Sequence, residues 1–318
     1  MGKVVEKKLI SFVIPCYGSE KTIYYVVKEI DETVSLNNDF DYEIIAVNDC
    51  SPDGVWSVLT QLAENNKKLK LINLSKNMNR PGAVMAGLNN TSGEYVCVLD
   101  DDGQCPMNRF WDLLDPLDNG YDVAMADYPE RKQSAFKDFG TFVNKKMTEY
   151  MLDRPKDLQF THFMIMKKYI AEELCNYKNP YPYMTGLILR TTINIKCVPM
   201  DERERYNGST NFTFKKMVSL WMNGLTAFSI KPLRLASIVG TLSAFIGFVY
   251  GLVIIFKKLS GENITQGYSS LMAVILFTNG IIMLLLGLIG EYLGRMYMCI
   301  NNSPQYVIKE RINFDDSK

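Results

Sequence analysis

The chain has 318 residues, of which 47% are hydrophobic, so it can form a large folded domain and is too apolar to be a disordered tether. Lysine plus arginine and aspartate plus glutamate number 35 each, and this zero net charge excludes attraction of nucleic acid through a global positive field. Seven cysteines without a CxxC pair argue against a disulfide framework or a zinc site and favour reduced, cytosol-facing thiols.

The N-terminal segment predicts a buried strand rather than a signal peptide. Lysines precede an apolar run, but Pro15 ends that run too early for a signal peptide. Residues 9–15, "LISFVIP", are rich in branched side chains, which is typical of a buried strand. Apolar residues at helical spacing then predict a helix over residues 20–35. We therefore expect this end of the chain to remain in the cytosol.

Strand and helix signals go on alternating along the chain. They predict strands over residues 42–49, 68–74 and 95–99, and helices over residues 50–66 and 82–92. This alternation predicts an α/β fold with a mostly parallel sheet, right-handed crossovers and helices on both faces. The segment "DVAMAD" at residues 122–127 is predicted to be the last strand of the sheet.

Polar clusters follow each of the first four predicted strands, at residues 15–20, 49–53, 76–80 and 100–104. In parallel sheets, ligands bind outside the carboxyl ends of the strands, so these clusters mark the expected ligand site. The chain has neither a GxGxxG fingerprint after its first strand nor a Walker loop. We expect any nucleotide at this edge to be held in another way.

Three consecutive aspartates stand directly after the fourth predicted strand. Alternate residues of an extended chain point the same way, so Asp100 and Asp102 can converge on one ligand while Asp101 faces elsewhere, towards a nucleoside. Two carboxylates and the amide oxygen of Gln104 suit Mg²⁺ or Mn²⁺, and a cation would remove the repulsion between the carboxylates. A solvated acidic turn is the alternative interpretation, but the position after a sheet strand favours the metal site.

The C-terminal part of the chain predicts two membrane-spanning helices. Residues 235–256 and 271–290 carry no charge, and each segment is long enough to cross a bilayer as a helix. Two core helices of a soluble protein are the alternative, but such helices usually have a polar face. The basic residues Lys231, Arg234 and Arg295 on the outer flanks favour a cytosolic location for both ends.

Four segments together resemble the successive motifs of the family 2 glycosyltransferases: "VIPCYGSE", "VNDCSPDG", "NRPGAVMAGLNNTSGEYVCVLDDDGQCP" and "ERYNGSTNF". More closely, the chain resembles the membrane-bound polyprenyl-phosphate glycosyltransferases, the group of the bactoprenol (undecaprenyl-phosphate) glucosyltransferases and dolichol-phosphate mannose synthase. The resemblance implies a cytoplasmic domain of the GT-A type over residues 1–230, including an amphipathic juxtamembrane helix at about 212–230. A two-helix transmembrane region would follow at 231–298, and a cytoplasmic tail at 299–318.

The resemblance also implies a reaction and its partners. We expect inverting, metal-dependent transfer of a monosaccharide from a nucleotide sugar, with UDP favoured, to a polyprenyl phosphate, for modification of a cell-envelope glycan. The enzyme would be a homo-oligomer, with a tetramer suggested by the group, in the inner membrane with its catalytic domain on the cytoplasmic face. Two alternatives stay open: a glycan or lipid-linked oligosaccharide acceptor, and a nucleotide-sugar-binding membrane scaffold without turnover. The donor sugar is not predicted.

The resemblance assigns roles to particular residues. Asp102 and Arg205 are the implied catalytic residues, and Asp100, Asp102 and Gln104 are the implied metal ligands. A planar guanidinium such as that of Arg205 can bind two phosphate oxygens at once. Asp49 can accept a uracil N3 proton, with a helix cap as its alternative role. The implied nucleotide-sugar site comprises Pro15, Tyr17, Glu20, Asp49, Lys76, Arg80, Asp101 and Ser209.

The acceptor site and the general base are the least defined parts of the site. The basic residues Arg131, Lys132 and Lys137 are candidates for binding the acceptor phosphate, although they also fit a solvated surface. Many relatives carry an aspartate where this chain has His162, so His162 or the nearby Asp157 is the candidate base. A base is not required, because a phosphate monoester with a second pKa of about 6 is already largely dianionic at neutral pH.

Overall fold

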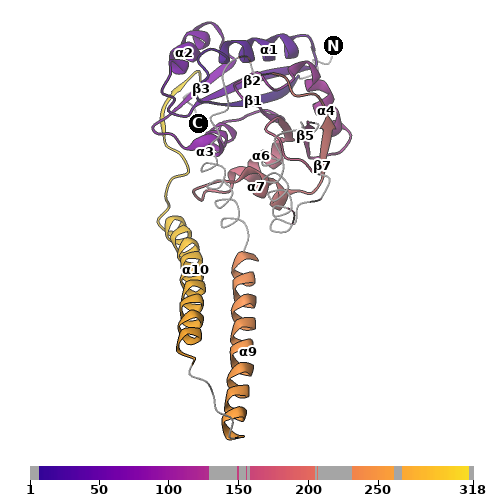
Figure 1. Cartoon of the computed structure of the whole chain (residues 1–318). Coiled ribbons are helices and arrows are strands. Elements are labelled where there is room, and N and C mark those ends of the chain that lie inside the picture. The colour runs from indigo at the N-terminus through magenta and orange to yellow at the C-terminus, as the bar shows by residue number, and fades with distance from the viewer. Residues whose placement is uncertain are drawn as a thin grey trace.

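The computed structural model describes residues 7–128, 149, 155, 158–204, 206, 231–260 and 267–314. They form an α/β domain, from which two long helices extend side by side (Figure 1). The predicted amphipathic helix at 212–230 lies outside the described residues, as do six predicted site residues: Arg131, Lys132, Lys137, Asp157, Arg205 and Ser209.

One eight-stranded sheet runs through the domain in the order β7-β5-β6-β4-β1-β2-β3-β8. β1 pairs in parallel with β2 and β4, and β2 pairs in parallel with β3, so the predicted parallel arrangement of these four strands is confirmed. The alternating elements are β1 (Lys8–Cys16), α1 (Ile23–Ser35), β2 (Phe40–Asn48), α2 (Val55–Asn65), β3 (Leu69–Leu74), α3 (Asn79–Leu88) and β4 (Tyr95–Val98).

Antiparallel strands extend this parallel centre. β6 is antiparallel to both β4 and β5, whereas β5 and β7 are parallel. The prediction that residues 122–127 form the last strand is wrong, because β6, β7 and β8 follow it. β6 and β7 are short, so they carry little period-two pattern of their own. The elements are η1 (Met107–Arg109), α4 (Phe110–Asp118), β5 (Val123–Asp127), β6 (Met164–Lys167), α6 (Lys168–Cys175), α7 (Met184–Thr191) and β7 (Ile195–Pro199).

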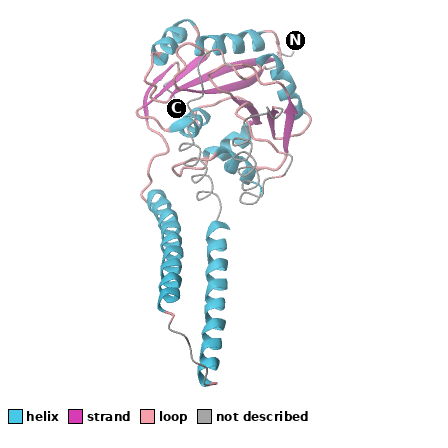
Figure 2. Cartoon of the chain, in the orientation of Figure 1, coloured by secondary structure: helices cyan, strands magenta, loops and turns pink. Residues whose placement is uncertain are grey.

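Helices cover both faces of the sheet, as Figure 2 shows. On β1, Phe12 packs in the core shared with α1, α2 and α4, whereas its neighbour Val13 packs in the core shared with α3, α6 and α7. The two adjacent side chains face opposite ways because side chains alternate along a strand. α3 lies so close to β1 that a Cβ on Gly87 would come within 2.3 Å of Val13 Cγ1. The apolar cores on the two faces of the sheet thus hold the central strands in place, and with them the loops at the strand ends.

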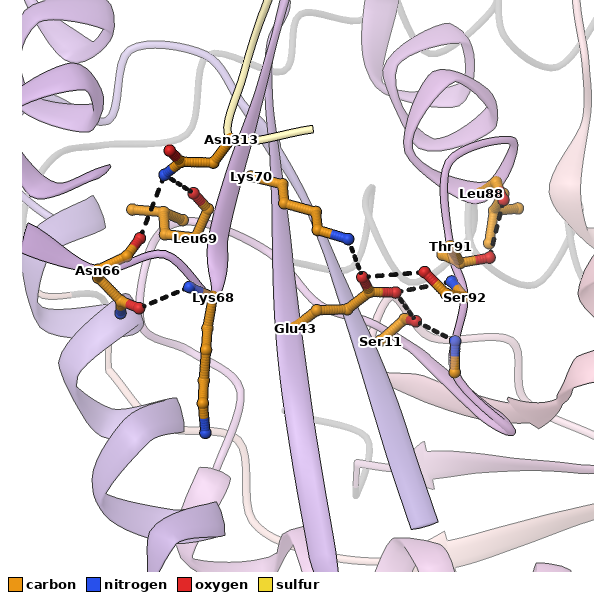
Figure 3. Close-up of polar contacts among 11 residues, drawn as sticks. Ser11, Glu43, Asn66, Lys68, Leu69, Lys70, Leu88, Thr91, Ser92 and Asn313 are labelled. Atoms are coloured by element: carbon orange, nitrogen blue, oxygen red, sulfur yellow. Dashed lines mark hydrogen bonds and ion pairs between the residues drawn. The ribbon is translucent and has the colours of Figure 1, made fainter. Parts of the chain in front are cut away.

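A buried glutamate joins three strands and a turn at the amino-terminal side of the sheet. Glu43 on β2 accepts hydrogen bonds from Ser11 Oγ on β1 at 2.5 Å, Lys70 Nζ on β3 at 2.6 Å and the Ser92 N–H at 2.6 Å (Figure 3). Burial acts to raise the pKa of Glu43, but the bonds from Lys70, Ser11 and Ser92 lower it below the ordinary value of 4.5. The carboxylate is therefore ionised and paired inside the domain.

The C-terminal helices are α9 (Lys231–Leu259) and α10 (Tyr268–Ile300). Within the described ranges, only Phe277–Ile300 of α10 is long and apolar enough to cross a membrane. The apolar part described in α9, Ala236–Tyr250, is shorter. Two helices are present as expected, but the prediction that both span a membrane is not confirmed.

The segment after α10 returns to the domain. Residues 299–318 are predicted as a tail, yet β8 (Ile308–Ile312) pairs antiparallel with β3 at the edge of the sheet. Just before β8, Gln305 is buried, and its Nε2 donates to the carbonyl oxygens of Tyr177 at 3.3 Å and Asn179 at 3.0 Å. The sequence "IKERI" does not predict a strand, because this edge strand has charged side chains and no apolar run.

Candidate functional site

Loops from the central strands meet at the carboxyl edge of the sheet. The Tyr17 N–H donates to Asp101 Oδ2 at 2.9 Å, which joins the loop after β1 to the loop after β4. The Met78 N–H donates to Asp49 Oδ1 at 2.6 Å, which joins the end of β2 to the loop before α3. The four polar clusters therefore gather at one edge, where a ligand of a parallel sheet binds.

Asp100 is bound by two side chains from other elements. Its Oδ1 accepts from Arg80 Nε at 2.7 Å, and its Oδ2 lies 2.9 Å from His162 Nδ1. Arg80 stands in the first turn of α3, and His162 shortly precedes β6. Burial acts to raise the pKa of Asp100, but Arg80 and His162 hold it far below its ordinary value. Asp100 is thus a carboxylate that already has a cationic partner.

Asp101 has different partners from Asp100. Its carboxylate accepts the Tyr17 N–H, and its carbonyl oxygen accepts from Thr22 Oγ1 at 2.6 Å. Burial raises the pKa of Asp101 to about 7, although the hydrogen bond from the Tyr17 N–H acts to lower it. Asp101 therefore ties the acidic turn to the start of α1, and its predicted contact with a nucleoside stays a prediction.

Asp102 and Gln104 belong to one tight turn. The Gln104 N–H donates to Asp102 Oδ1 at 3.1 Å, and Gly103 between them has a φ of 81°, which favours glycine. Gln104 Nε2 donates to Glu202 Oε1 at 3.1 Å and to the Arg203 carbonyl oxygen at 3.3 Å. The protein thus fixes the orientation of the Gln104 amide through two residues that the sequence analysis did not single out.

The acidic turn has the ligand chemistry of a divalent-cation site. Carboxylate and amide oxygens suit Mg²⁺ and Mn²⁺, and Mg²⁺ often takes only one or two carboxylates and leaves other positions to water and phosphate. Asp102 and Gln104 fit that pattern. Asp100 would first have to exchange Arg80 for the cation. Across the described part of the chain, no group of three or more His, Cys, Asp and Glu residues is arranged to hold a metal.

The predicted nucleotide residues differ in exposure. Asp49 is 3% exposed, and burial raises its pKa to about 6. Its bond to Met78 supports the alternative role of a helix cap, although for α3 rather than for the helix that follows it in the chain. Tyr17 is exposed and Pro15 is buried within β1.

Glu20 and Lys76 lie in two different loops at the same edge. Glu20 Oε2 accepts the Gly54 N–H at 3.2 Å, while the Glu20 N–H donates to Asp53 Oδ2 at 2.9 Å. These bonds fasten the loop after β1 to the start of α2. Lys76 is exposed in the loop between β3 and α3. Glu20 is therefore engaged by the protein, whereas Lys76 faces solvent.

The sequence profile described as glycosyl transferase family 2 matches residues 11–175, which are more than half of the chain and include the acidic turn. The chain therefore belongs to glycosyl transferase family 2. A second profile, described as the GtrB C-terminal hairpin, matches residues 231–296, which contain α9 and most of α10. The resemblance drawn from the sequence motifs is confirmed at the level of the family.

Relatives of this family 2 glycosyltransferase match almost its whole length. An uncharacterized glycosyltransferase, YkcC of Bacillus subtilis, is 29% identical over 309 residues, which cover 97% of this chain and 95% of that protein. The SfII prophage-derived bactoprenol glucosyl transferase of Shigella flexneri is 29% identical over 307 residues, covering 95% of this chain and 97% of that protein.

Solved structures share the fold of the family 2 glycosyltransferase domain. Mannosyl-3-phosphoglycerate synthase from Rubrobacter xylanophilus aligns with a TM-score of 0.56 and 16% identity, over 72% of this chain and 74% of that one. Glucosyl-3-phosphoglycerate synthase from Mycobacterium tuberculosis, in complex with Mn²⁺ and UDP-glucose, aligns with a TM-score of 0.51 and 18% identity, over 69% and 77%. The α/β, GT-A-like architecture with a mostly parallel sheet is therefore confirmed.

The chemistry at the edge of this glycosyltransferase is that of positioning and charge stabilisation. Three cysteines near the site, Cys16, Cys97 and Cys105, are buried, and burial raises the pKa of each thiol. Such thiols are protonated at neutral pH and are poor nucleophiles. Carboxylates, an amide, Arg80, His162 and the N-terminal end of α3 also lie at this edge. These groups suit binding of a diphosphate and a cation.

Proposed function

We propose that this family 2 glycosyltransferase transfers a monosaccharide from a nucleotide sugar to a polyprenyl phosphate at a membrane. One observation carries the proposal: the Asp100–Gln104 turn stands at the carboxyl edge of the sheet in a chain whose C-terminal helices match the GtrB hairpin. The name of the Shigella flexneri relative, a bactoprenol glucosyl transferase, supports a polyprenyl acceptor, because the two proteins match along nearly their whole length.

The donor diphosphate would bind between the acidic turn and the start of α3. Arg80 in the first turn of α3, exposed Lys76 and the positive end of the helix supply partners for phosphate oxygens. Asp102 and Gln104, with Asp100 after it exchanges partners, would hold Mg²⁺ or Mn²⁺. That cation would supply charge stabilisation for the leaving diphosphate. The M. tuberculosis neighbour, solved with Mn²⁺ and UDP-glucose, supports Mn²⁺ and a uridine donor.

The nucleoside would lie near the ends of β1 and β2. In this proposal the ionised Asp49 accepts the N–H of the nucleobase, and exposed Tyr17 contacts the ring. Pro15, Glu20 and Asp101 would shape the loop around them. Arg205 and Ser209, which the sequence motif places near the donor phosphates, complete the proposed donor site.

The acceptor phosphate oxygen would attack the anomeric carbon of the sugar. A bond from that carbon to the lipid phosphate forms, the bond to the nucleoside diphosphate breaks, and the configuration inverts. The acceptor arrives largely as a dianion, so no proton has to be removed. The bond between His162 Nδ1 and Asp100 favours a role for His162 in holding Asp100 rather than as a base. Asp157 is the second candidate base, and the proposed acceptor residues are Arg131, Lys132 and Lys137.

The membrane association of the enzyme would come from its C-terminal helices. The apolar segment Phe277–Ile300 supports insertion, and the flanking basic residues favour a catalytic domain on the cytoplasmic face of the inner membrane. A Cβ added to Gly240 or Gly247 on α9 would meet no atom within 4 Å. Such small residues permit close contact with a helix of another protomer, which supports the proposed homo-oligomer, a tetramer.

A screen of nucleotide sugars tests the proposal. The purified full-length protein receives polyprenyl phosphate, Mg²⁺ or Mn²⁺ and one nucleotide sugar at a time, and mass spectrometry detects the lipid. We expect one donor to add one sugar residue to the lipid phosphate. Asp102→Asn should lose about 100-fold or more of the activity, because the cation contributes several kcal/mol. Asp118→Asn is the matched control, since Asp118 is exposed and pairs with Lys8 at 3.3 Å.

A lipid-linked sugar formed equally well by Asp102→Asn would contradict the proposed metal site. Transfer of sugar to an oligosaccharide, with none to polyprenyl phosphate, would contradict the proposed acceptor.

A further inference from the structure

Arg203 and Tyr206, which follow β7 in the chain, are hydrogen-bonded through their backbones to the acidic turn at residues 100–104. The Arg203 N–H donates to the Gln104 carbonyl oxygen at 3.2 Å, and the Tyr206 N–H donates to the Asp102 carbonyl oxygen at 3.2 Å. Gln104 Nε2 donates in return to the Arg203 carbonyl oxygen at 3.3 Å. The turn that carries two of the three proposed metal ligands is therefore held from outside the sheet.

Glu29 on α1 binds the side chains of both Arg203 and Tyr206. Its carboxylate accepts from the Arg203 guanidinium and from the Tyr206 hydroxyl, the latter at 3.3 Å. The other end of the guanidinium donates to Asn108 Oδ1 beyond the turn. The side chains of Glu29 and Arg203 are only 22% and 31% exposed, so solvent screens their ion pair less than a surface pair. A planar guanidinium that bridges two acceptors also fixes the direction of the segment.

Gly103 makes room for this attachment. A Cβ added to Gly103 would lie 2.0 Å from Tyr206 Cδ2, closer than any real contact, and the φ of 81° at this position also favours glycine. The Tyr206 ring also packs on Tyr25 of α1, with 5.7 Å between ring centroids and the two rings tilted by 47°. The ring thus contacts both the turn and α1, and a side chain at position 103 would displace it.

We infer that Glu29, Arg203 and Tyr206 form a clamp that positions the Asp102–Gln104 turn for the cation and the donor diphosphate. The inference rests on the proposed function. Glu29 acts through Arg203 and Tyr206, whose backbones hold Gln104 and Asp102. In the sequence, Arg205 stands between the two clamped residues. Loosening the clamp should therefore weaken binding of the metal–diphosphate unit without unfolding the domain.

Glu29→Gln tests the clamp against a matched control on the same helix. Glu32→Gln removes an acid one turn further along α1, where Glu32 pairs with Lys28 at 3.6 Å and both side chains are exposed. The probe is UDP with Mn²⁺, titrated into the full-length protein by calorimetry, and thermal unfolding is measured in parallel. We expect Glu29→Gln to weaken UDP–Mn²⁺ binding about tenfold, as loss of a residue that supports metal ligands does. Glu32→Gln should bind as the wild type does, and both variants should remain folded at the temperature of the titration.

A second set of variants separates positioning from stability. Tyr206→Phe keeps the ring and removes only the hydroxyl, so it should lose less affinity than Glu29→Gln, and the double variant should equal Glu29→Gln alone. Gly103→Ala should reproduce the loss of Glu29→Gln by displacing the Tyr206 ring. In turnover, the KM for the donor should rise more than kcat falls.

Wild-type affinity for UDP–Mn²⁺ in Glu29→Gln would overturn the inference, and so would equal losses in Glu29→Gln and Glu32→Gln. A loss of affinity caused by unfolding of Glu29→Gln at the temperature of the titration would also overturn it, because the residue would then be structural. Binding of UDP does not involve the lipid acceptor. If the wild type binds UDP–Mn²⁺ but forms no lipid-linked sugar, the proposed function fails while the clamp stands.

Discussion

Asp49 is a buried carboxylate at the carboxyl end of β2. Burial raises its pKa from 3.8 to about 6. A raised pKa means that the folded protein takes up this proton more readily than the unfolded chain does. The stability that Asp49 contributes is therefore fully present below its ordinary pKa and is lost as the pH rises through about 6. The ionised form at neutral pH is thus maintained at a cost to stability, which a role in binding would explain.

Asp49→Asn should change the pH dependence of nucleotide binding. The terminal phosphate of UDP also titrates at about pH 6, so the pH dependence has to be compared between variants. If the ionised carboxylate accepts the base N–H, the affinity of the wild type for UDP–Mn²⁺ should fall about tenfold more per pH unit below about pH 6 than the affinity of Asp49→Asn does. Calorimetry from about pH 5 to about pH 8 measures both proteins. His162→Gln, which alters the same edge and leaves Asp49 in place, should keep the wild-type slope; equal slopes in the wild type and Asp49→Asn would contradict the assigned role.

For individual residues, the sequence predicts which side chains lie at the carboxyl edge of the sheet, but not which of them form hydrogen bonds or ion pairs with one another. The alternation of strand residues separates Asp101 from its neighbours, and the structure gives it separate partners. Asp100 bonds to Arg80 on α3 and to His162 in the segment before β6. These residues are far apart in the sequence, so no local pattern predicts the contact. The sequence of α1 likewise contains nothing that distinguishes Glu29 from the other acidic residues of that helix.

Among the elements, the central strands are held together by polar as well as apolar contacts. β1, β2 and β3 and the turn before β4 share the buried carboxylate of Glu43 (Figure 3). Its side chain is 6% exposed, whereas that of Lys70 is 23% exposed. Because its pKa is lowered, the stability from Glu43 is present above the ordinary value of 4.5 and is lost as the pH falls through the lower value of the folded state.

Glu43→Ala should destabilise the domain by about 3 kcal/mol, because it leaves the Lys70 ammonium and the Ser92 N–H without their partner. Glu43→Gln should cost less, since the amide can still accept a hydrogen bond. Thermal unfolding of the full-length protein at neutral pH measures the effect. Glu64→Ala, which removes an exposed acid from α2, is the control. Equal unfolding temperatures for Glu43→Ala and Glu64→Ala would show that the buried contacts contribute nothing.

The elements that the sequence predicts best are those with strong periodicity. Four parallel strands and the helices between them follow from branched apolar runs and helical spacing, and the structure confirms them. β6 and β7 are four and five residues long, and β8 is a charged edge strand. Pairing with neighbours defines these three strands, so their own sequences carry little signal.

In the whole molecule, β8 connects the hydrophobic helices to the sheet. The chain leaves the domain into α9, returns through α10 and ends as an added edge strand, as Figure 1 shows. Asn313, directly after β8, has a left-handed backbone with a φ of 61°. Its Nδ2 donates to the carbonyl oxygens of Ala63 at 3.0 Å, Asn66 at 3.3 Å and Leu69 at 2.9 Å. The segment predicted as a tail is therefore part of the catalytic domain.

Asn313→Gly and Asn313→Ala test how much the hydrogen bonds of Asn313, at the end of β8, stabilise the domain. Glycine tolerates the left-handed backbone and loses only the side-chain hydrogen bonds, so it should cost about 1 to 2 kcal/mol. Alanine loses the same bonds and adds backbone strain of about 1 kcal/mol. Thermal unfolding should therefore rank the wild type above Asn313→Gly, and Asn313→Gly above Asn313→Ala. Wild-type stability in both variants would mean that the C-terminal segment is only loosely attached.

The central claim is that the acceptor is the phosphate of a polyprenyl lipid, and an acceptor competition with the full-length protein tests it most directly. The donor found in the screen is supplied in labelled form with Mn²⁺, together with polyprenyl phosphate, polyprenol and a lipid-linked oligosaccharide in one mixture, and the products are separated by mass. We predict label only in a species one sugar residue heavier than polyprenyl phosphate, and none when Asp102→Asn replaces the wild type. Label in the oligosaccharide or in polyprenol, with polyprenyl phosphate unchanged, would contradict the claim.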